Sequence, residues 1–358
     1  AKQLSKAPRL PVALGRARYA AAQGARVAWY MGQYYLARGL STPVNRPGEP
    51  EYKPANPPGN ANRIWEAFLE LFAKDRANIE AGLYAAPGEV NVTRALSALT
   101  NSAKFFSDLP DVDARRIARR GVEVRESNAP RGRYPTYYLQ NFHYQTGGWL
   151  TKESEAIYDT QVEVLFGGAA AAMRRIALGS LLRGLKGRDQ RKSAHLDIGC
   201  GNGLFLKSIL EARPKLHATG LDLSPIYVNA ARERLSPWPQ ADVVTGAAES
   251  APFADASFES ASAIYLFHEL PPRVRRDVAR ELARLVKPGG VFVLGDSVQW
   301  DDLPDFNQML EYFPHGFHEP YFASYADEDL EALFLEAGFA LEETELAFLT
   351  KVMRFRRV

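Results

Sequence analysis

A glycine-rich stretch in the second half of the chain has the residue types and spacing of a ligand-binding loop. Residues 197–203 read DIGCGNG and follow a short apolar segment. Glycine lets a loop adopt positive φ and lets a ligand approach the backbone closely. The spacing G-x-G-x-G differs from the G-x-G-x-x-G of dinucleotide sites, and Asp197 lies close enough to the glycines to repel a pyrophosphate. An acid at this position suits a ligand that carries an ammonium or sulfonium group.

A second carboxylate, Asp222, follows the next apolar segment, 25 residues after Asp197. In parallel α/β folds, an acid at about this interval meets the hydroxyls of a ribose. The competing interpretation is an N-cap for a helix that begins near Pro225, but Ser224 is better placed for that role. The glycine loop and the acid, in this order, favour S-adenosylmethionine over a nicotinamide dinucleotide as the ligand.

The segment from Ser193 to Gly295 resembles class I S-adenosylmethionine-dependent methyltransferases. The resemblance implies that S-adenosylmethionine is the cofactor, that Asp222 binds both ribose hydroxyls and that Leu223 lies against the adenine. It also implies a seven-stranded sheet with an antiparallel hairpin at one end. The first motif of the family corresponds here to Asp197, Gly199, Gly201 and Gly203. Cys200, inside the same loop, is expected to contribute its backbone position and no nucleophilic chemistry.

The third motif departs from the family pattern. Residues 246–258 read GAAESAPFADASF, whereas the family usually reads G-D-A-x-x-L-P-F. Ala247 stands where an aspartate often receives the adenine amino group. The resemblance therefore implies that backbone groups of Ala247 and Ala248, or the side chain of Glu249, take over this contact. Tyr265, in a segment that reads IYLFH, matches the end of the strand beside the methyl donor.

An aromatic segment precedes the predicted catalytic domain. Residues 137–150 read YYLQNFHYQTGGWL, and the Gly-Gly pair supplies a flexible turn. One interpretation is that these rings stack into a domain interface. The other, for which Tyr144 and Trp149 are the leading candidates, is a lid that closes over the cofactor, where aromatic faces would attract the sulfonium.

Histidines follow the predicted fourth and fifth strands, at the edge of the sheet where ligands bind. His268 is the first candidate for a general base, followed by His143 and His318, because an unperturbed imidazole titrates near neutral pH. For His318 and its neighbour His315, the alternative is a hydrogen-bonded interface. The same two loops also carry Glu269, Glu319 and Tyr321. No H-x-x-x-H pair with a third ligand occurs within one element, so no metal site is expected.

The elements that must position these residues alternate between strands and helices after residue 169. This alternation predicts an α/β, Rossmann-like, doubly wound sheet with helices on both faces. The expected strands cover residues 194–198, 218–223, 242–245, 260–266, 291–296, 341–349 and 352–355, and the expected helices cover 204–212, 225–235, 272–286 and 327–337.

The first part of the chain has a different character. Helical spacing of apolar residues predicts a mainly helical N-terminal domain, with helices over about 11–39, 63–83 and 91–106. A proline-rich arm separates the first two, at about 41–62, and a basic run at 115–133 predicts a solvated helix face or a contact with an anionic surface. The predicted domains are therefore 1–135, an aromatic connector at 136–169, and a catalytic domain at 170–358.

Composition excludes several classes of protein. Cys200 is the single cysteine, so a disulfide-stapled fold and a thiolate metal site are excluded, and a cytoplasmic location is expected. The chain has 44 Lys and Arg residues against 42 Asp and Glu, and this net charge of +2 does not predict a nucleic-acid partner. Residues 19–40 are apolar but interrupted by polar side chains, so they do not predict a membrane span.

The sequence as a whole predicts methyl transfer to a small, lipophilic or aromatic acceptor, on oxygen or carbon, by in-line displacement. Two alternatives stay open: a cofactor-binding protein without transfer activity, whose helical half mediates assembly, and a protein methyltransferase. The departure at Ala247 favours the first of these alternatives. A homodimer through the helical domain and a peripheral membrane contact are further predictions.

Overall fold

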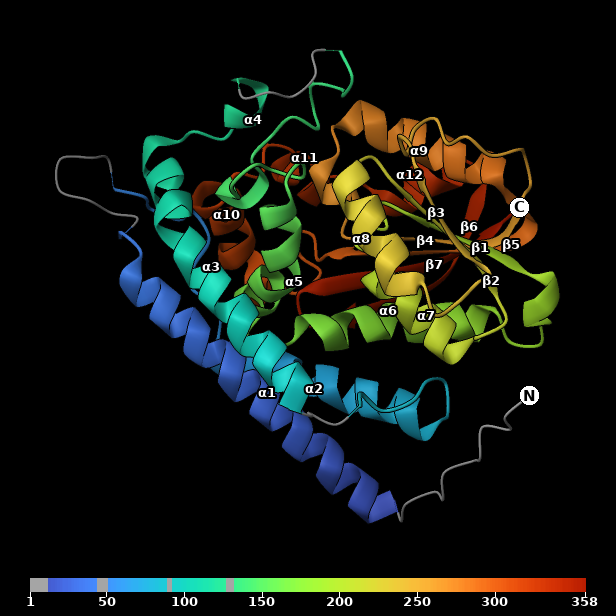
Figure 1. The fold of residues 1–358 in the computed structure, drawn as a ribbon, viewed down its shortest axis with the longest axis horizontal. Coiled ribbons are helices and arrows are strands. Elements are labelled where there is room, and N and C mark those ends of the chain that lie inside the picture. Colours follow the sequence, from blue (N-terminus) through green and yellow to red (C-terminus); the bar gives the residue numbers. More distant parts are fainter. Residues whose placement is uncertain (1–11, 44–50, 89–91, 127–131) are drawn as a thin grey trace.

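The computed structural model describes residues 12–43, 51–88, 92–126 and 132–358 (Figure 1). Its centre is a seven-stranded sheet with the order β3-β2-β1-β4-β5-β7-β6. The first five strands of this order are parallel, and β7 lies antiparallel between β5 and β6. The strands are β1 (Ala194–Ile198), β2 (His217–Asp222), β3 (Ala241–Thr245), β4 (Phe258–Ile264), β5 (Val286–Ser297), β6 (Phe339–Ala347) and β7 (Thr350–Arg357). The predicted doubly wound sheet with a terminal hairpin is confirmed.

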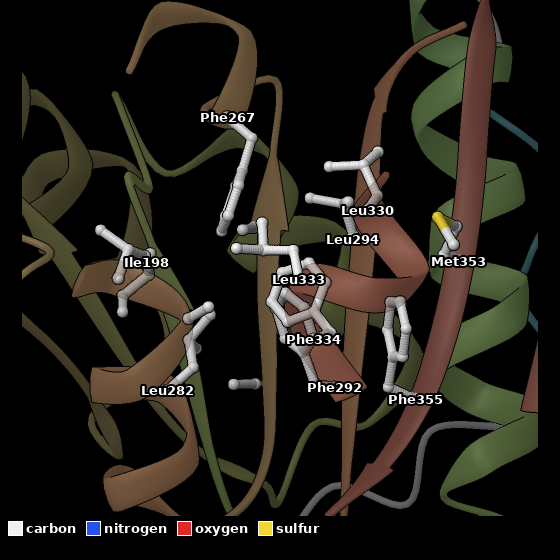
Figure 2. Packing of buried hydrophobic residues seen from close by; sticks show 14 of the residues in the cluster. Ile198, Phe267, Leu282, Phe292, Leu294, Leu330, Leu333, Phe334, Met353 and Phe355 are labelled. Carbon is white, nitrogen blue, oxygen red and sulfur yellow. The ribbon is translucent and has the colours of Figure 1, made fainter. Parts of the chain in front are cut away.

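Two apolar layers cover the faces of the sheet. One is formed by α6 (Ala170–Gly184), α7 (Leu204–Ala212) and α8 (Pro225–Leu235), which pack against β2, β3, β5 and β7. The other is formed by α9 (Pro272–Leu285), α10 (Asn307–Gly316), α11 (Phe322–Ala326) and α12 (Leu330–Glu336). In the second layer, Phe334 of α12 packs against Phe292 and Phe355 of the sheet, and Leu282 of α9 belongs to the same apolar cluster (Figure 2). These layers fix the carboxyl ends of the parallel strands, where the glycine loop lies.

Helices of the first part of the chain lie along the outside of this domain (Figure 1). They are α1 (Val12–Leu40), α2 (Ala61–Glu80), α3 (Val92–Ala118), α4 (Glu123–Glu126) and α5 (Lys152–Leu165). The third helix continues twelve residues past its predicted end and passes through Pro110. Four single turns of 3-10 helix complete the described chain: η1 (Phe142–Tyr144), η2 (Gln190–Lys192), η3 (Phe267–Glu269) and η4 (Pro304–Phe306).

A buried carboxylate joins the outer helices to the sheet domain. Asp75 of α2 is fully buried and accepts two hydrogen bonds from the guanidinium of Arg175 in α6, at 2.8 and 2.6 Å. The hydroxyls of Tyr19 in α1 and Tyr84 also donate to Asp75. Because a buried charge is stable only when it is paired and hydrogen-bonded, this arrangement fixes α1 and α2 against α6.

The proline-rich arm contacts the catalytic domain. Residues 44–50 of the predicted arm lie outside the described residues, and residues 51–60 contain no helix or strand. The backbone N–H groups of Ala55 and Asn56 donate to the carboxylate of Glu311 in α10, at 2.7 and 2.9 Å. The arm therefore follows the surface of α10 before the chain enters α2.

Much of the basic run is paired within the chain. Arg115 donates to Glu123 at 2.6 Å and to Thr146 at 2.8 Å, and Arg116 pairs with Asp113. Arg120 keeps an exposed side chain, and Arg131 lies outside the described residues. Much of the run therefore stabilises local structure.

The surface of the outer helices exposes several large apolar side chains. On α1 and α3 they are Leu14, Trp29, Tyr35, Leu36, Leu40, Leu96 and Leu99. Among the described helices, no single one is long and apolar enough to cross a membrane, although the bent pair α5 and α6 meets the criteria of length and composition. The predicted homodimer and membrane contact would involve this surface, and both stay predictions.

Candidate active site

The glycine loop connects β1 to α7 and has a conformation that favours glycine. Gly199, Gly201 and Gly203 adopt φ values of 67°, 52° and 76°. A Cβ atom on Gly199 would lie 3.0 Å from the side chain of Leu266, and one on Gly203 would lie 3.0 Å from that of Ala231. Positive φ and close packing together explain why residues with side chains are disfavoured in this loop.

The carboxylate of Asp222, at the end of β2, holds the glycine loop. One oxygen accepts the backbone N–H of Gly201 at 2.8 Å, and the other accepts the N–H of Ser224 at 2.8 Å. Burial raises the pKa of Asp222, while these backbone donors favour its charged form. The Ser224 hydroxyl accepts the N–H of Tyr227 and so caps α8, as the sequence predicts. Asp222 is therefore not the N-cap residue of α8, and it lines the pocket.

One pocket brings the loop and this acid together. Most of the lining comes from the sheet domain, and the rest comes from the connector and α5. The sheet domain contributes Gly199, Gly201, Leu221, Asp222, Leu223, Tyr227, Gly246, Ala248, Ile264, Tyr265, Leu266, Glu269 and Leu270. The connector and α5 contribute Tyr137, Tyr138, Phe142, Trp149 and Tyr158.

Three predicted cofactor residues in the glycine loop lie outside the pocket lining. Asp197 is buried and accepts a hydrogen bond from the hydroxyl of Ser262 in β4. Burial raises the pKa of Asp197 to about 7. The thiol of Cys200 is also buried, which raises its pKa well above the usual range and agrees with a structural position. Gly203 precedes α7 and packs against α8.

The segment after β3 forms a further wall. Ala248 lines the pocket, whereas Ala247 and Glu249 do not appear in its lining. Glu249 accepts a hydrogen bond from the hydroxyl of Tyr137 at 2.8 Å. Because Tyr137 lines the pocket, Glu249 anchors the connector at this wall.

An aromatic cluster closes the pocket from the connector side. Trp149 stacks on Phe142 at 6.0 Å between ring centroids and makes edge contacts with Tyr158 and Tyr227 at 5.3 and 5.7 Å. The hydroxyl of Ser224 donates to the carbonyl oxygen of Trp149 at 2.6 Å. The connector is thus fixed to the N-terminus of α8, and Trp149 lines the pocket together with the glycine loop.

Tyr144, the second predicted lid residue, lies elsewhere. Its ring is buried near the imidazole of His318, with 5.6 Å between the ring centroids, and does not line the pocket. His143 and Tyr144 adopt φ values of 54° and 55°, which are uncommon for residues with side chains. This turn directs Phe142 toward the pocket and Tyr144 away from it.

The three histidines that the sequence predicts as bases do not line the pocket. His318 lies with Nε2 2.8 Å from the amide oxygen of Gln140 in the connector, as expected for a hydrogen-bonded interface. His143 is buried, and burial together with the nearby His268 and His318 lowers its pKa to about 3. His143 is therefore neutral at physiological pH.

His268 is paired with an acid that the sequence analysis did not single out. Its Nδ1 lies 2.6 Å from the carboxylate of Asp296 in β5. Burial alone would lower the pKa of His268, but the charge of Asp296 outweighs it and raises this pKa to about 9. The imidazole is therefore protonated at neutral pH and forms a buried ion pair.

Two further carboxyl groups lie beside this pair. Glu269 lines the pocket, and Glu319 is fully buried with its carboxylate 3.4 Å from Nε2 of His143. Burial raises the pKa of Glu269 to about 8 and that of Glu319 well above its usual range. Within the described residues, no three His, Cys, Asp or Glu side chains are grouped so that they would hold a metal ion.

The residues that sequence reasoning missed include Asp296, Phe142, Tyr158 and Tyr227. Asp296 is the last residue of the fifth predicted strand. Because ligands bind at the carboxyl ends of parallel strands, this position could have identified Asp296 as a candidate site residue. The aromatic residues gave no such signal, because spacing alone does not tell which ring of an aromatic-rich segment faces a pocket.

Comparison with known proteins finds similarity to methyltransferases. Residues 196–290 match the sequence family described as a methyltransferase domain. A demethylmenaquinone methyltransferase of Lysinibacillus sphaericus is 27% identical over 34% of this chain and 51% of its own length. A 2-methyl-6-phytyl-1,4-hydroquinone methyltransferase of Synechocystis sp. is 33% identical over 40% of this chain and 46% of its own.

A 24-methylenesterol C-methyltransferase of Oryza sativa subsp. japonica is 30% identical over 44% of this chain and 45% of its own length. The chain therefore spans about half the length of the curated relatives that it matches. The matched part contains the glycine loop and Asp222, and the family model does not extend to the outer helices.

Proposed function

The chain carries a class I S-adenosylmethionine-dependent methyltransferase domain, and on this premise we propose that it transfers the methyl group of S-adenosylmethionine to a small, lipophilic or aromatic acceptor. The observation that carries the proposal is the pocket shared by the glycine loop and Asp222. A carboxylate with remaining lone pairs suits ribose hydroxyls, and the open backbone at Gly201 suits the close approach of a ligand.

The residues present fit this cofactor. Leu223 and Ala248, which line the pocket together with Asp222, offer apolar contacts for a purine ring. The indole Nε1–H of Trp149 is buried at the pocket without a hydrogen-bond partner in the described chain. A buried donor without a partner is costly, so a ligand that accepts from it would be favoured.

The acceptor is proposed from the lining and from the relatives. Nearly all of the lining beyond Asp222 and Glu269 is aromatic, aliphatic or glycine, which favours an apolar acceptor. The relatives named for a quinone precursor, a phytyl-hydroquinone and a sterol act on apolar molecules, and we extend that class to this chain. Methylation on oxygen or on an activated carbon both fit this class.

The protein contributes to methyl transfer mainly by aligning the acceptor with the methyl group, because the cofactor itself supplies the reactive group. When bound, S-adenosylmethionine supplies an electrophilic methyl carbon with a thioether as the leaving group. The walls of the pocket would exclude water and hold an acceptor in line with that carbon. The acceptor's proton would go to Glu269, because the oxygens of Asp222 already accept two backbone N–H groups.

The predicted base His268 has a different role in this proposal. Its protonated ring and its bond to Asp296 leave it without a lone pair for the acceptor's proton at neutral pH. We propose that it orients the turn Phe267–Glu269, so that Glu269 lines the pocket.

Mass spectrometry of the purified protein, combined with calorimetric titration of S-adenosylhomocysteine, tests this function. Asp222→Asn is expected to weaken binding about 10- to 100-fold, the size expected for hydrogen bonds to a charged group. Asp242→Asn, at an exposed site in β3, is the matched control and should not change binding. No binding by the wild type would contradict the proposal, whereas binding without transfer to quinol, phenol or sterol acceptors would favour the cofactor-binding alternative.

A further inference from the structure

The carboxyl group of Glu269 faces the cofactor pocket without a partner in the described chain. Glu269 lines the pocket together with Gly199, Asp222 and Tyr265. The indole N–H of Trp149 is close enough to favour its charged form but does not reach hydrogen-bond geometry. An acid in this position is available to a ligand.

Glu319 precedes α11, which packs against the turn Phe267–Glu269, and its carboxyl group is also unsatisfied. Within the described chain, neither of its buried carboxyl oxygens has a hydrogen-bond partner, and the neighbouring His143 is neutral. Glu319 and Glu269 influence each other's titration through space. Two carboxyl groups in such a setting hold at least one proton between them, because two buried like charges repel.

The nearby cation, His268, already has a partner, and the other nearby charges are negative. His268 favours ionisation of both glutamates, but its charge is paired with Asp296. Asp296 itself opposes ionisation of both glutamates, and Asp222 opposes ionisation of Glu269. The pair thus lacks a cation of its own.

We propose that Glu269 and Glu319 act as a counter-charge for the sulfonium of S-adenosylmethionine, so that binding of the methyl donor releases one proton from the pair. This inference rests on the proposed function of the same pocket. The product, S-adenosylhomocysteine, carries a neutral thioether in place of the sulfonium and does not require the charge. The pair therefore discriminates the methyl donor from the product and leaves Glu269 ionised before methyl transfer.

The proposal predicts a pH dependence that differs between the two ligands. Burial raises the pKa of Glu269 to about 8, so the free protein keeps the proton at neutral pH. Binding that requires loss of one proton strengthens by up to about tenfold for each pH unit below that pKa and levels off above it. The affinity for the product, whose sulfur is neutral, should change less than about twofold between pH 6 and 7.5.

Isothermal titration of the full chain with S-adenosylmethionine and with S-adenosylhomocysteine tests the proposal. Titrations at pH 6 to 7.5, in two buffers with different ionisation enthalpies, give the number of protons released. Glu269→Gln is titrated in parallel with the wild type. The α-amino group of each ligand also titrates, but its contribution is the same for both proteins and cancels when the two proton numbers are subtracted. Glu319→Gln is the second variant, in case Glu269→Gln does not fold.

The expected result is release of close to one proton on binding of the methyl donor by the wild type and of none by Glu269→Gln. The variant should bind the methyl donor about tenfold or more weakly and the product almost unchanged. Asp222→Asn should weaken both ligands by the same factor. Equal pH profiles for the two ligands, or an equal loss of both in Glu269→Gln, would overturn the inference. Failure of both ligands to bind the wild type would instead overturn the proposed function.

Discussion

Nδ1 of His268 lies 2.6 Å from Oδ1 of Asp296, and the other oxygen of Asp296 accepts the backbone N–H of Phe267 at 2.7 Å. One carboxylate of β5 therefore holds both the imidazole and the backbone of the turn that follows β4. This turn carries Glu269 into the pocket. The relationship makes His268 a positioning residue and gives the molecule a pH-dependent contribution to stability.

The first prediction concerns His268→Gln. The folded pKa of His268, about 9, lies above its unfolded value of 6.5, so its stabilisation is complete below pH 6.5 and is lost as pH rises through 9. The variant should lose about 3 kcal/mol of unfolding free energy at pH 6.5 and much less at pH 10. Urea denaturation at several pH values measures this.

His195→Gln is the matched control for this series. His195 is buried between Ser260 and Ser262, and burial lowers its pKa to about 3, so it is neutral from pH 6.5 to 10. Its loss should cost the same across that range. A destabilisation by His268→Gln that is equally constant with pH would contradict the ion pair.

The second prediction compares two glycines with positive φ. Gly199→Ala introduces a Cβ atom 3.0 Å from Leu266 at φ +67°, whereas Gly187→Ala introduces one with no atom within 4 Å at φ +82°. Both should lose about 1–2 kcal/mol of unfolding free energy from the backbone conformation. Only Gly199→Ala should also weaken binding of S-adenosylhomocysteine, by tenfold or more, as measured by calorimetry. Equal binding by the two variants would show that the loop does not contact the cofactor.

The third prediction concerns the aromatic lid. Trp149→Ala removes the ring that stacks on Phe142 over the pocket, and should weaken binding of S-adenosylhomocysteine about tenfold, the effect of losing roughly 1–1.5 kcal/mol of aromatic contact. Cofactor should protect residues 136–150 of the wild type from limited proteolysis but not those of the variant. Trp65→Ala, on the exposed side of α2, is the control. Protection confined to other segments would contradict a lid at this position.

The fourth prediction concerns the attachment of the outer helices. Asp75→Ala leaves the guanidinium of Arg175 buried without its partner, and breaking a buried pair in this way costs about 3–5 kcal/mol. Chemical denaturation should show this loss, whereas Asp111→Ala on the surface of α3 should change the unfolding free energy by less than about 0.5 kcal/mol. A small effect of Asp75→Ala would mean that the outer helices are held mainly by apolar contacts.

Much of the sheet domain was predictable because its signals are local. The helices 204–212 and 225–235 begin and end where the sequence predicts, since glycine, serine and proline mark their first turns. The predicted strand at 260–266 is shifted to Phe258–Ile264 in the structure. Tyr265 adopts a φ of 56°, which ends the strand. Such a turn is set by packing against the neighbouring strands and leaves no mark in apolar spacing.

By itself, the sequence determined which functional group follows each predicted strand. A glycine loop follows the first strand, an acid follows the second, and a polar turn follows the fourth. Only the tertiary structure decided which side chains share a cavity. Asp197 and Asp222 both follow short apolar segments, but β4 buries the first against Ser262 while the second lines the pocket. Glu319 comes close to the turn Phe267–Glu269 because α11, which follows Glu319, packs against that turn. Burial and charge pairing depend on contacts between distant segments, and local spacing does not encode them.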